Sequence, residues 1–167
     1  SSDVALDVGR DEESLHSGAA TYVTDNYFEV LGIRPIAGVG LPVHAQSGTD
    51  APDLISVISH VVWDRFYGRA GDVVGRTLKV NGVPVTVVGV APRRFNGART
   101  GGSQVRVWLP LSARWIVQRS PSQGVPGYDT AIFGLIARLQ PGVETSRTLP
   151  TVQAIAARAA HQTPPRA

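Results

Sequence analysis

The stretch RTLKVNGVPVTVVGV, residues 76–90, decides the fold, because it predicts a β-hairpin from its own chemistry. Asn81-Gly82 is the residue pair favoured by a two-residue type I′ turn, in which both positions need a positive φ. Apolar and polar residues alternate on both sides of this turn, as they do in strands with one buried face. Pro84 removes one backbone donor and indicates an edge position or a nearby bulge. We expect Asn81 and Gly82 to form a structural turn.

The chain before this hairpin predicts a second hairpin followed by a short helix. Residues 2–8 alternate apolar and polar side chains, and residues 15–23 can return beside them as a strand. A helix is expected over residues 26–31, with Gly32 at the position where a left-handed residue ends a helix. Residues 33–42 are punctuated by glycine and proline, so we expect them to be irregular.

A strand and a helix are expected between the two hairpins. Residues 44–53 are polar and indicate an exposed loop. Residues 54–59 (LISVIS) form a compact apolar run that is typical of a buried strand. The Ser59 hydroxyl can then cap a helix over residues 60–67, in which the apolar side chains lie at helical spacing. Gly68 is expected to end this helix.

The remainder of the chain predicts two strands and two helices. We expect a strand at 105–111, a short helix and a long loop within 112–129, and an apolar strand at 130–139. A helix with one apolar stripe is expected over 144–160, although Pro150 would interrupt it. Tight turns outnumber helical crossovers, so the fold class is α+β with mostly antiparallel pairing.

The composition limits the class of protein. A chain of 167 residues can bury a real core, and 43% of its residues are hydrophobic. No apolar run approaches the roughly 18 residues that span a bilayer. The sequence has no cysteine, which excludes disulfides, thiolate catalysis and cysteine–zinc sites. It has no methionine either, which hints at a segment taken from a longer protein.

The charge is distributed unevenly along the chain, although the net charge is only +3. Residues 1–33 hold seven acidic residues and one basic residue, whereas residues 65–119 hold ten basic residues and one acidic residue. Such asymmetry is typical of proteins that bind an acidic partner or nucleic acid. It also arises in proteins that simply have two oppositely charged surfaces, and this second interpretation is favoured here.

The residues with catalytic potential do not form a recognisable motif. The four histidines have no metal-ligand spacing, and no serine lies in a G-x-S-x-G elbow. The chain has no Walker-type phosphate loop, and Gly38-Val39-Gly40 lacks the third glycine of a dinucleotide loop. We therefore expect no catalytic residue, no cofactor and no metal site, and we do not expect an enzyme.

One exposed cluster is a candidate partner-contact loop. It lies in the basic, glycine-rich segment 92–104 and consists of Arg93, Arg94, Phe95 and Arg99. An aromatic side chain among arginines can enter a pocket of a partner or stack on a base. Alternatively, Phe95 folds back onto the sheet and anchors the loop. The sequence leaves both interpretations open.

Several stretches, taken in order, resemble the MacB-like periplasmic core domain of ABC transporter permeases, which belong to the macrolide-exporter and lipoprotein-release superfamily. The resemblance extends from about residue 19 to residue 160 and points to the branch of orphan permeases. The residues that carry it are Tyr22-Val23-Thr24, Asn26 to Gly32, Ile55 to Ser59, Trp63 and Phe66, Gly75 to Leu78 with the Asn81-Gly82 turn, Val87 to Pro92, Phe95, Val107 to Leu111, Ala137 to Leu139 and Pro141-Gly142.

The resemblance implies a non-catalytic domain on the periplasmic face of the bacterial inner membrane, held between two transmembrane helices of a longer protein. ATP hydrolysis in a cytoplasmic subunit or domain would drive a motion that this domain relays in export or efflux. The implied partners are the flanking helices, the cytoplasmic ATPase of the same transporter and a periplasmic adaptor or substrate protein. The resemblance implies no nucleic-acid partner. A dimer is implied for the full transporter, whereas the isolated domain is expected to be monomeric.

The resemblance also implies a domain organisation. Residues 1–167 would form the extracytoplasmic core domain, with a β-rich inserted subdomain at about 15–130 and a strand and helix of a porter-like α/β subdomain at 131–162. The N-terminal porter part that family members have before this segment has no counterpart in the sequence, so the porter-like subdomain is expected to be partial.

A free-standing periplasmic protein is the alternative function. Such a protein would bind or hydrolyse a ligand in a cleft beside residues 92–129. The complete gene discriminates between the two hypotheses, because a permease domain requires transmembrane helices encoded on its flanks.

Overall fold

The computed structural model describes residues 2–9, 16–42, 54–98, 105–117 and 134–161. The chain divides into two compact units, Ser1–Ile136 and Ala137–Ala167. The expected loop at 44–53 and the long loop expected after residue 117 lie outside the described residues.

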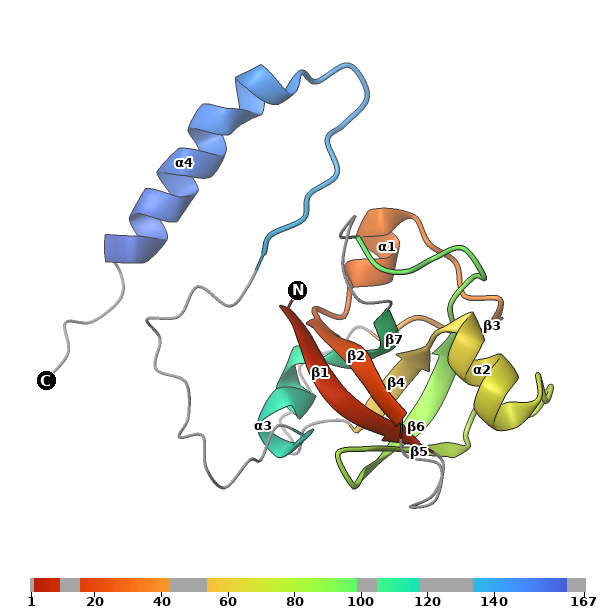
Figure 1. Cartoon of the computed structure of the whole chain (residues 1–167). Coiled ribbons are helices and arrows are strands. Elements are labelled where there is room, and N and C mark those ends of the chain that lie inside the picture. Colours follow the sequence, from red (N-terminus) through yellow and green to blue (C-terminus); the bar gives the residue numbers. More distant parts are fainter. Residues whose placement is uncertain (1, 10–15, 43–53, 99–104, 118–133, 162–167) are drawn as a thin grey trace, which may run out of the picture. The chain divides into compact units, whose positions relative to one another are not determined.

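The described strands of the first unit form one sheet of seven strands, in the order β3-β6-β4-β7-β2-β1-β5. The strands are β1 (Ser2–Gly9), β2 (His16–Val23), β3 (Ala37–Gly38), β4 (Ile55–Ile58), β5 (Thr77–Val80), β6 (Val83–Val90) and β7 (Val105–Pro110). Because β5 also pairs with β6, six of these strands form a closed ring, and the short β3 is added to β6 outside it (Figure 1). The strand β1 precedes residue 15 in the sequence and belongs to the same sheet.

The sheet is mixed, which refines the expectation of mostly antiparallel pairing. The strands β2 and β7 run parallel, and so do β4 and β6. The other described pairs are antiparallel. Parallel strands need a long connection, and here β4 reaches β6 through α2 (His60–Tyr67) and β5. The sequence pattern could indicate tight turns, but not pairing between strands that lie far apart in the chain.

The β5–β6 hairpin forms within residues 76–90, as the sequence predicts. Val80 and Val83 are partners in the antiparallel register, and they are joined by Asn81 with φ 50° and Gly82 with φ 76°. Pro84 pairs with Lys79 on one side only, because β4 begins to pair with β6 at Thr86. No strand other than β5 pairs with β6 at Pro84, so the missing N–H of Pro84 does not interrupt the pairing of β6 with β4.

Two helices of the first unit, α1 and α2, begin and end close to where the sequence places them. In α2, the Ser59 side chain accepts a hydrogen bond from the Val62 N–H at 3.3 Å, and Gly68 follows with φ 56°. The helix α1 (Tyr27–Leu31) ends at Gly32, which has φ 67°. The β7 strand leads directly into a 3-10 turn, η2 (Leu111–Ala113), and then into the short helix α3 (Arg114–Val117).

The strand β3 was not expected, because the sequence predicted irregular structure over residues 33–42. It pairs with only two residues of β6, Val90 and Gly89. A Cβ atom on Gly89 would overlap the carbonyl oxygen of Val39, so only glycine lets these two backbones approach so closely. This contact between distant residues has no signature in the local pattern.

Both faces of the sheet are covered by apolar side chains, because consecutive strand residues point in opposite directions. The first cluster includes Tyr22, Leu78, Val85, Leu109 and Val62 of α2. The second cluster gathers alternate strand residues, including Val23, Val57 and Trp108, together with Phe28 of α1. Two clusters, one on each face, make the β-rich part a compact body of its own.

The C-terminal part of the chain differs from the sequence prediction. Residues 134–140 carry no strand pairing in the structure, although the sequence predicts a strand over 130–139, and residues 130–133 lie outside the described residues. An apolar run becomes a strand only when another strand satisfies its backbone groups. The helix α4 (Thr145–His161) has nearly the bounds expected from the sequence, but it continues through Pro150, which was expected to interrupt it. A proline this close to the N-terminal end removes a single backbone hydrogen bond.

Candidate interaction surface

The candidate contact loop follows β6 and is partly anchored to the sheet. Arg93 and Arg94 are exposed, whereas Phe95 is half-buried and packs against the second cluster. The ring of Phe95 stacks on Trp108 with centroids 5.2 Å apart and an interplanar angle of 28°. Of the two interpretations that the sequence left open for this side chain, the structure has Phe95 folded back. Arg99 lies outside the described residues.

An aromatic group holds the loop in place. Phe95 also contacts the rings of Tyr27 and Phe28, at centroid distances of 6.4 Å and 5.9 Å. The hydroxyl of Tyr27 accepts a hydrogen bond from the Ala98 N–H at 3.0 Å. Aromatic pairs at such distances contribute about 0.5–1.5 kcal/mol each beyond their buried area. Arg93 and Arg94 are therefore presented from a fixed turn.

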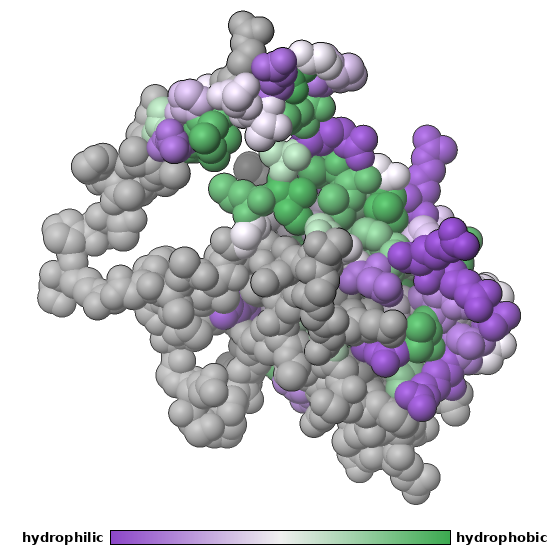
Figure 2. Space-filling model, turned by 45° about the horizontal axis from the view of Figure 1, so that its top comes forward, coloured by the Kyte–Doolittle hydropathy of each residue, from purple (hydrophilic) through white to green (hydrophobic). Residues whose placement is uncertain are grey.

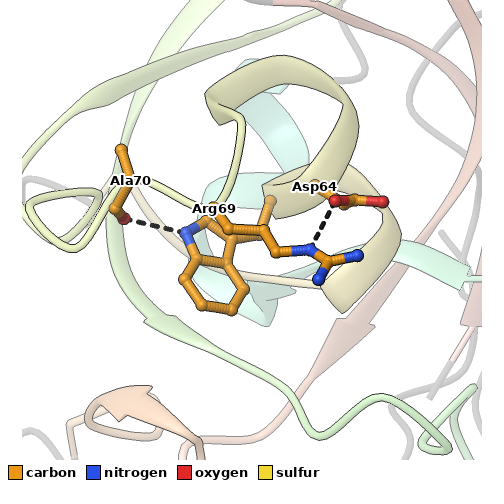
Figure 3. Close-up of polar contacts among 4 residues, drawn as sticks. Asp64, Arg69 and Ala70 are labelled. Atoms are coloured by element: carbon orange, nitrogen blue, oxygen red, sulfur yellow. Dashed lines mark hydrogen bonds and ion pairs between the residues drawn. The ribbon is translucent and has the colours of Figure 1, made fainter.

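The C-terminal end of α2 is a second well-ordered surface element (Figure 3). The indole N–H of Trp63 donates to the carbonyl oxygen of Ala70 at 2.9 Å, and the Nε of Arg69 donates to Asp64 at 2.5 Å. Arg69 itself has φ 59°, a left-handed conformation that is uncommon for residues other than glycine. Its N–H closes the end of the helix by bonding to the Trp63 carbonyl oxygen at 3.2 Å.

Cationic groups lower the pKa of Asp64. The hydrogen bond from Arg69 is the main cause that holds the pKa of Asp64 below its usual value, and the charges of Arg69, His60 and Arg93 lower it further. Of these groups, Arg93 has the smallest effect, and it belongs to the loop after β6. His60 packs edge-to-face on Trp63, with centroids 5.5 Å apart.

Two polar groups are buried beneath this surface. The hydroxyl of Tyr22 and the indole N–H of Trp108 are buried and have no hydrogen-bond partner among the described residues. Burial raises the pKa of Tyr22 well above its ordinary value, and the charge of the buried Arg114 opposes this shift in part. Within the described ranges, no group of three or more His, Cys, Asp or Glu side chains could hold a metal ion.

The surface is divided into apolar and polar areas. On the face in Figure 2, hydrophilic residues gather along the right-hand side. Exposed apolar side chains of the first unit include Ile36, Val39 and Val74 beside β3. None of the helices in the described part of the chain is long and apolar enough to cross a membrane.

The local sequence pattern did not indicate the contact between Asp64 and Arg69 or the Trp63–Ala70 bond. One signal was present, because Arg69 directly follows Gly68 at the expected end of a helix. The residue after a helix-ending glycine often adopts an unusual conformation. The effect of Arg93 on the pKa of Asp64 had no such signal, since the two residues lie far apart in the sequence.

Comparisons with known proteins agree with this fold. The model of the MacB-like periplasmic core domain matches residues 2–155. Over 88 residues the chain is 30% identical to a probable export ATP-binding/permease protein of Pseudomonas fluorescens, a match that covers 53% of this chain and 13% of that protein.

Two solved structures share the fold. The periplasmic region of MacB from Actinobacillus actinomycetemcomitans is similar with a TM-score of 0.61 and 13% identity, over 95% of this chain and 64% of that one. A domain assigned to a permease protein from Porphyromonas gingivalis is similar with a TM-score of 0.55 and 16% identity, over 94% of this chain and 61% of that one. The chain thus spans less than two thirds of each of these relatives.

Proposed function

Because the chain belongs to the family of MacB-like periplasmic core domains, we propose that it is the part of an ABC export permease that stands outside the membrane and relays motion. In this proposal the domain performs no covalent chemistry. ATP hydrolysis on the cytoplasmic side moves the transmembrane helices, and the domain transmits that motion to a substrate or partner protein. The family match carries the proposal.

The structure of the first unit supports a relay role. A relay must move as one body, and a closed ring of strands with an apolar cluster on each face resists local deformation. Such a body can pass on a displacement applied at one end. In this proposal, the switch between two conformations takes place where the first unit meets neighbouring parts of the transporter, and not inside the unit.

The domain organisation and partners are part of the same proposal. The ring of strands corresponds to the β-rich inserted subdomain, and residues 137–161 with α4 belong to a porter-like α/β subdomain. The partners are the flanking transmembrane helices, the cytoplasmic ATPase and a periplasmic adaptor or substrate protein, and the transporter works as a dimer in the bacterial inner membrane. Arg93, Arg94 and Phe95 form the contact loop towards the partner, with Phe95 fixing the position of the two arginines.

The coding sequence on both sides of this segment tests the localisation. The proposal expects a stretch of about 18 or more apolar residues on each flank, the length that spans a bilayer. A gene that encodes a free-standing exported protein without such stretches would contradict it. That result would favour the alternative, a periplasmic protein that binds or hydrolyses a ligand.

Reconstitution of the complete permease tests the relay. We expect Arg93→Asn combined with Phe95→Ala to reduce export while ATP hydrolysis continues, because the motor is intact and the contact loop is not. Arg34→Asn is the matched control, since Arg34 is also an exposed arginine of the same unit. Equal loss of hydrolysis and export in the double variant would contradict a relay through this loop.

A further inference from the structure

The chain contains two Asn-Gly pairs, and they lie in different kinds of backbone. Asn81-Gly82 forms the turn between β5 and β6, whereas Asn96-Gly97 lies in the contact loop and belongs to no helix or strand. Both asparagines are exposed to solvent. The two pairs therefore share one chemistry in two structural settings, so the fold decides how their reactivities differ.

Asn-Gly is the sequence in which an asparagine loses its side-chain amide most readily. The backbone nitrogen of the glycine attacks the side-chain carbonyl carbon Cγ, and a five-membered succinimide ring forms. The proton of the glycine N–H passes through solvent to the amide nitrogen, which leaves as ammonia. Water then opens the ring, adding its OH to one carbonyl carbon and its proton to the ring nitrogen, which gives aspartate or isoaspartate. Glycine favours the attack because it has no Cβ and its backbone rotates freely.

The fold restrains this reaction at Asn81. The Nδ2 atom of its side chain donates a hydrogen bond to the Val117 carbonyl oxygen at 3.1 Å, which ties the leaving group to the end of α3. The backbone is held as well, because Val80 and Val83 pair on either side of the turn. Ring closure requires the side chain to leave Val117 and the nitrogen of Gly82 to turn towards Cγ. Both restraints therefore raise the barrier to deamidation.

Asn96 lacks these restraints within the described part of the chain. No described residue is a hydrogen-bond partner of its side chain. The loop is anchored on either side of the pair, by the ring of Phe95 before it and by the bond from the Ala98 N–H to Tyr27 after it. The anchors keep the loop in place, while the side chain of Asn96 keeps the rotational freedom that ring closure needs.

We propose that Asn96 is a site of spontaneous deamidation, and that the fold suppresses the same reaction at Asn81. Both products add a carboxylate to the contact loop, two residues after the exposed Arg94. Isoaspartate also adds one carbon atom to the backbone between Phe95 and Ala98, the two anchors of the loop. The reaction thus changes both the charge and the length of this segment. The inference goes beyond the proposed function and does not depend on it.

Incubation of the purified chain at mildly alkaline pH tests the difference between the two pairs. Trypsin cleaves after lysine and arginine, so it places Asn81 in the peptide of residues 80–93 and Asn96 in the peptide of residues 95–99. Mass spectrometry gives the rate at which each peptide exchanges its amide for a carboxyl group. We expect Asn96 to convert at least about fivefold faster, the factor contributed by one hydrogen bond of ordinary net strength.

The chain unfolded in guanidinium chloride is the matched control. The denaturant removes both restraints on Asn81 and leaves the sequence unchanged, so the two pairs should convert there at similar rates. Equal rates in the folded chain, or a faster rate at Asn81, would overturn the proposal. So would an Asn96 that stays intact in the folded chain. A difference of the same size in denaturant would overturn it too, because neighbouring residues and not the fold would then set the rates.

The variant Asn96→Asp separates the added charge from the added backbone atom. It carries the carboxylate on a backbone of normal length, so the bond to Tyr27 should still protect the Ala98 amide from hydrogen exchange. The isoaspartate fraction of the incubated protein should exchange this amide at least about fivefold faster than the variant does. Equal exchange in the two would overturn the change assigned to the loop. Thermal unfolding midpoints check that both proteins remain folded.

Discussion

Tyr22 and Trp108 bury polar atoms on opposite faces of one sheet. Tyr22 belongs to the first apolar cluster and Trp108 to the second. A buried polar atom without a partner costs about 1–3 kcal/mol relative to a satisfied one. The volume and apolar surface of both rings therefore stabilise the fold. Their buried polar atoms lower the free energy of unfolding.

Two tyrosine variants test this interpretation by opposite effects. Tyr22→Phe should raise the free energy of unfolding by about 1 kcal/mol, because it removes a buried hydroxyl for which the described residues supply no hydrogen-bond partner. Tyr67→Phe should lower it by a similar amount, because the Tyr67 hydroxyl donates to the Thr77 carbonyl oxygen at 2.9 Å. Urea unfolding followed by circular dichroism measures both. The same sign in both variants would show that the Tyr22 hydroxyl has a partner in solution.

Tyr22 also predicts a loss of stability in alkali. Because burial raises the pKa of Tyr22 in the folded protein, the unfolded chain ionises at a lower pH, near the ordinary value of 10.0. Above that pH the unfolded chain binds fewer protons than the folded protein, so the free energy of unfolding falls as pH rises. In Tyr22→Phe this part of the fall should disappear, and an unchanged alkaline profile would contradict the assigned burial.

Gly89→Ala should destabilise the protein by about 2–4 kcal/mol, because the new Cβ would overlap the Val39 carbonyl oxygen and separate β3 from β6. Gly71→Ala is the matched control, since a Cβ at Gly71 meets no atom within 4 Å. Thermal unfolding compares the two. Equal midpoints would mean that β3 does not lie against β6 in solution.

At the residue scale, the sequence could predict positions whose role is local. Ser59, Gly32 and Gly68 act on backbone groups within a few residues of themselves, so their types and spacing were sufficient. The roles of Gly89, Asp64 and Tyr22 depend on what another segment places beside them. No local pattern carries that information.

The same distinction between local and long-range information explains which strands and helices the sequence could predict. The hairpin around Asn81-Gly82 and the helix α2 were predicted because their turn and cap residues specify them directly. The strand β3 has only two residues and no alternation to detect. Residues 134–140 have the apolar content of a strand without the pairing, because composition indicates burial and not the partner that supplies hydrogen bonds.

Ser59→Ala tests the start of α2. The variant removes the side-chain oxygen that accepts from the Val62 N–H, so the free energy of unfolding should fall by about 1 kcal/mol. Ser112→Ala, at an exposed position in η2, should change it much less. Chemical denaturation measures both variants, and a Ser59→Ala protein as stable as the wild type would show that water replaces the cap at no cost.

At the scale of the whole molecule, ring closure was the feature that the sequence could not predict. Each hairpin is local, but the ring is closed by β1 against β5 and by β2 against β7. The first of these contacts involves only two register pairs, Val8 with Val80 and Gly9 with Lys79. The family resemblance supplied the β-rich fold class, while the closure depends on pairings between residues remote in the chain.

Closure predicts that the β-rich unit opens as a whole. In a ring every strand has two neighbours, so separating any pair exposes the apolar clusters that the remaining strands share. Native-state hydrogen exchange should give the slowest amides of β2, β6 and β7 one common opening free energy. Gly89→Ala should lower that value by the same amount in all three strands, although β2 does not touch the substituted residue. A lower value in β6 with unchanged protection in β2 would mean that the β1–β2 hairpin opens independently and that the ring is not closed in solution.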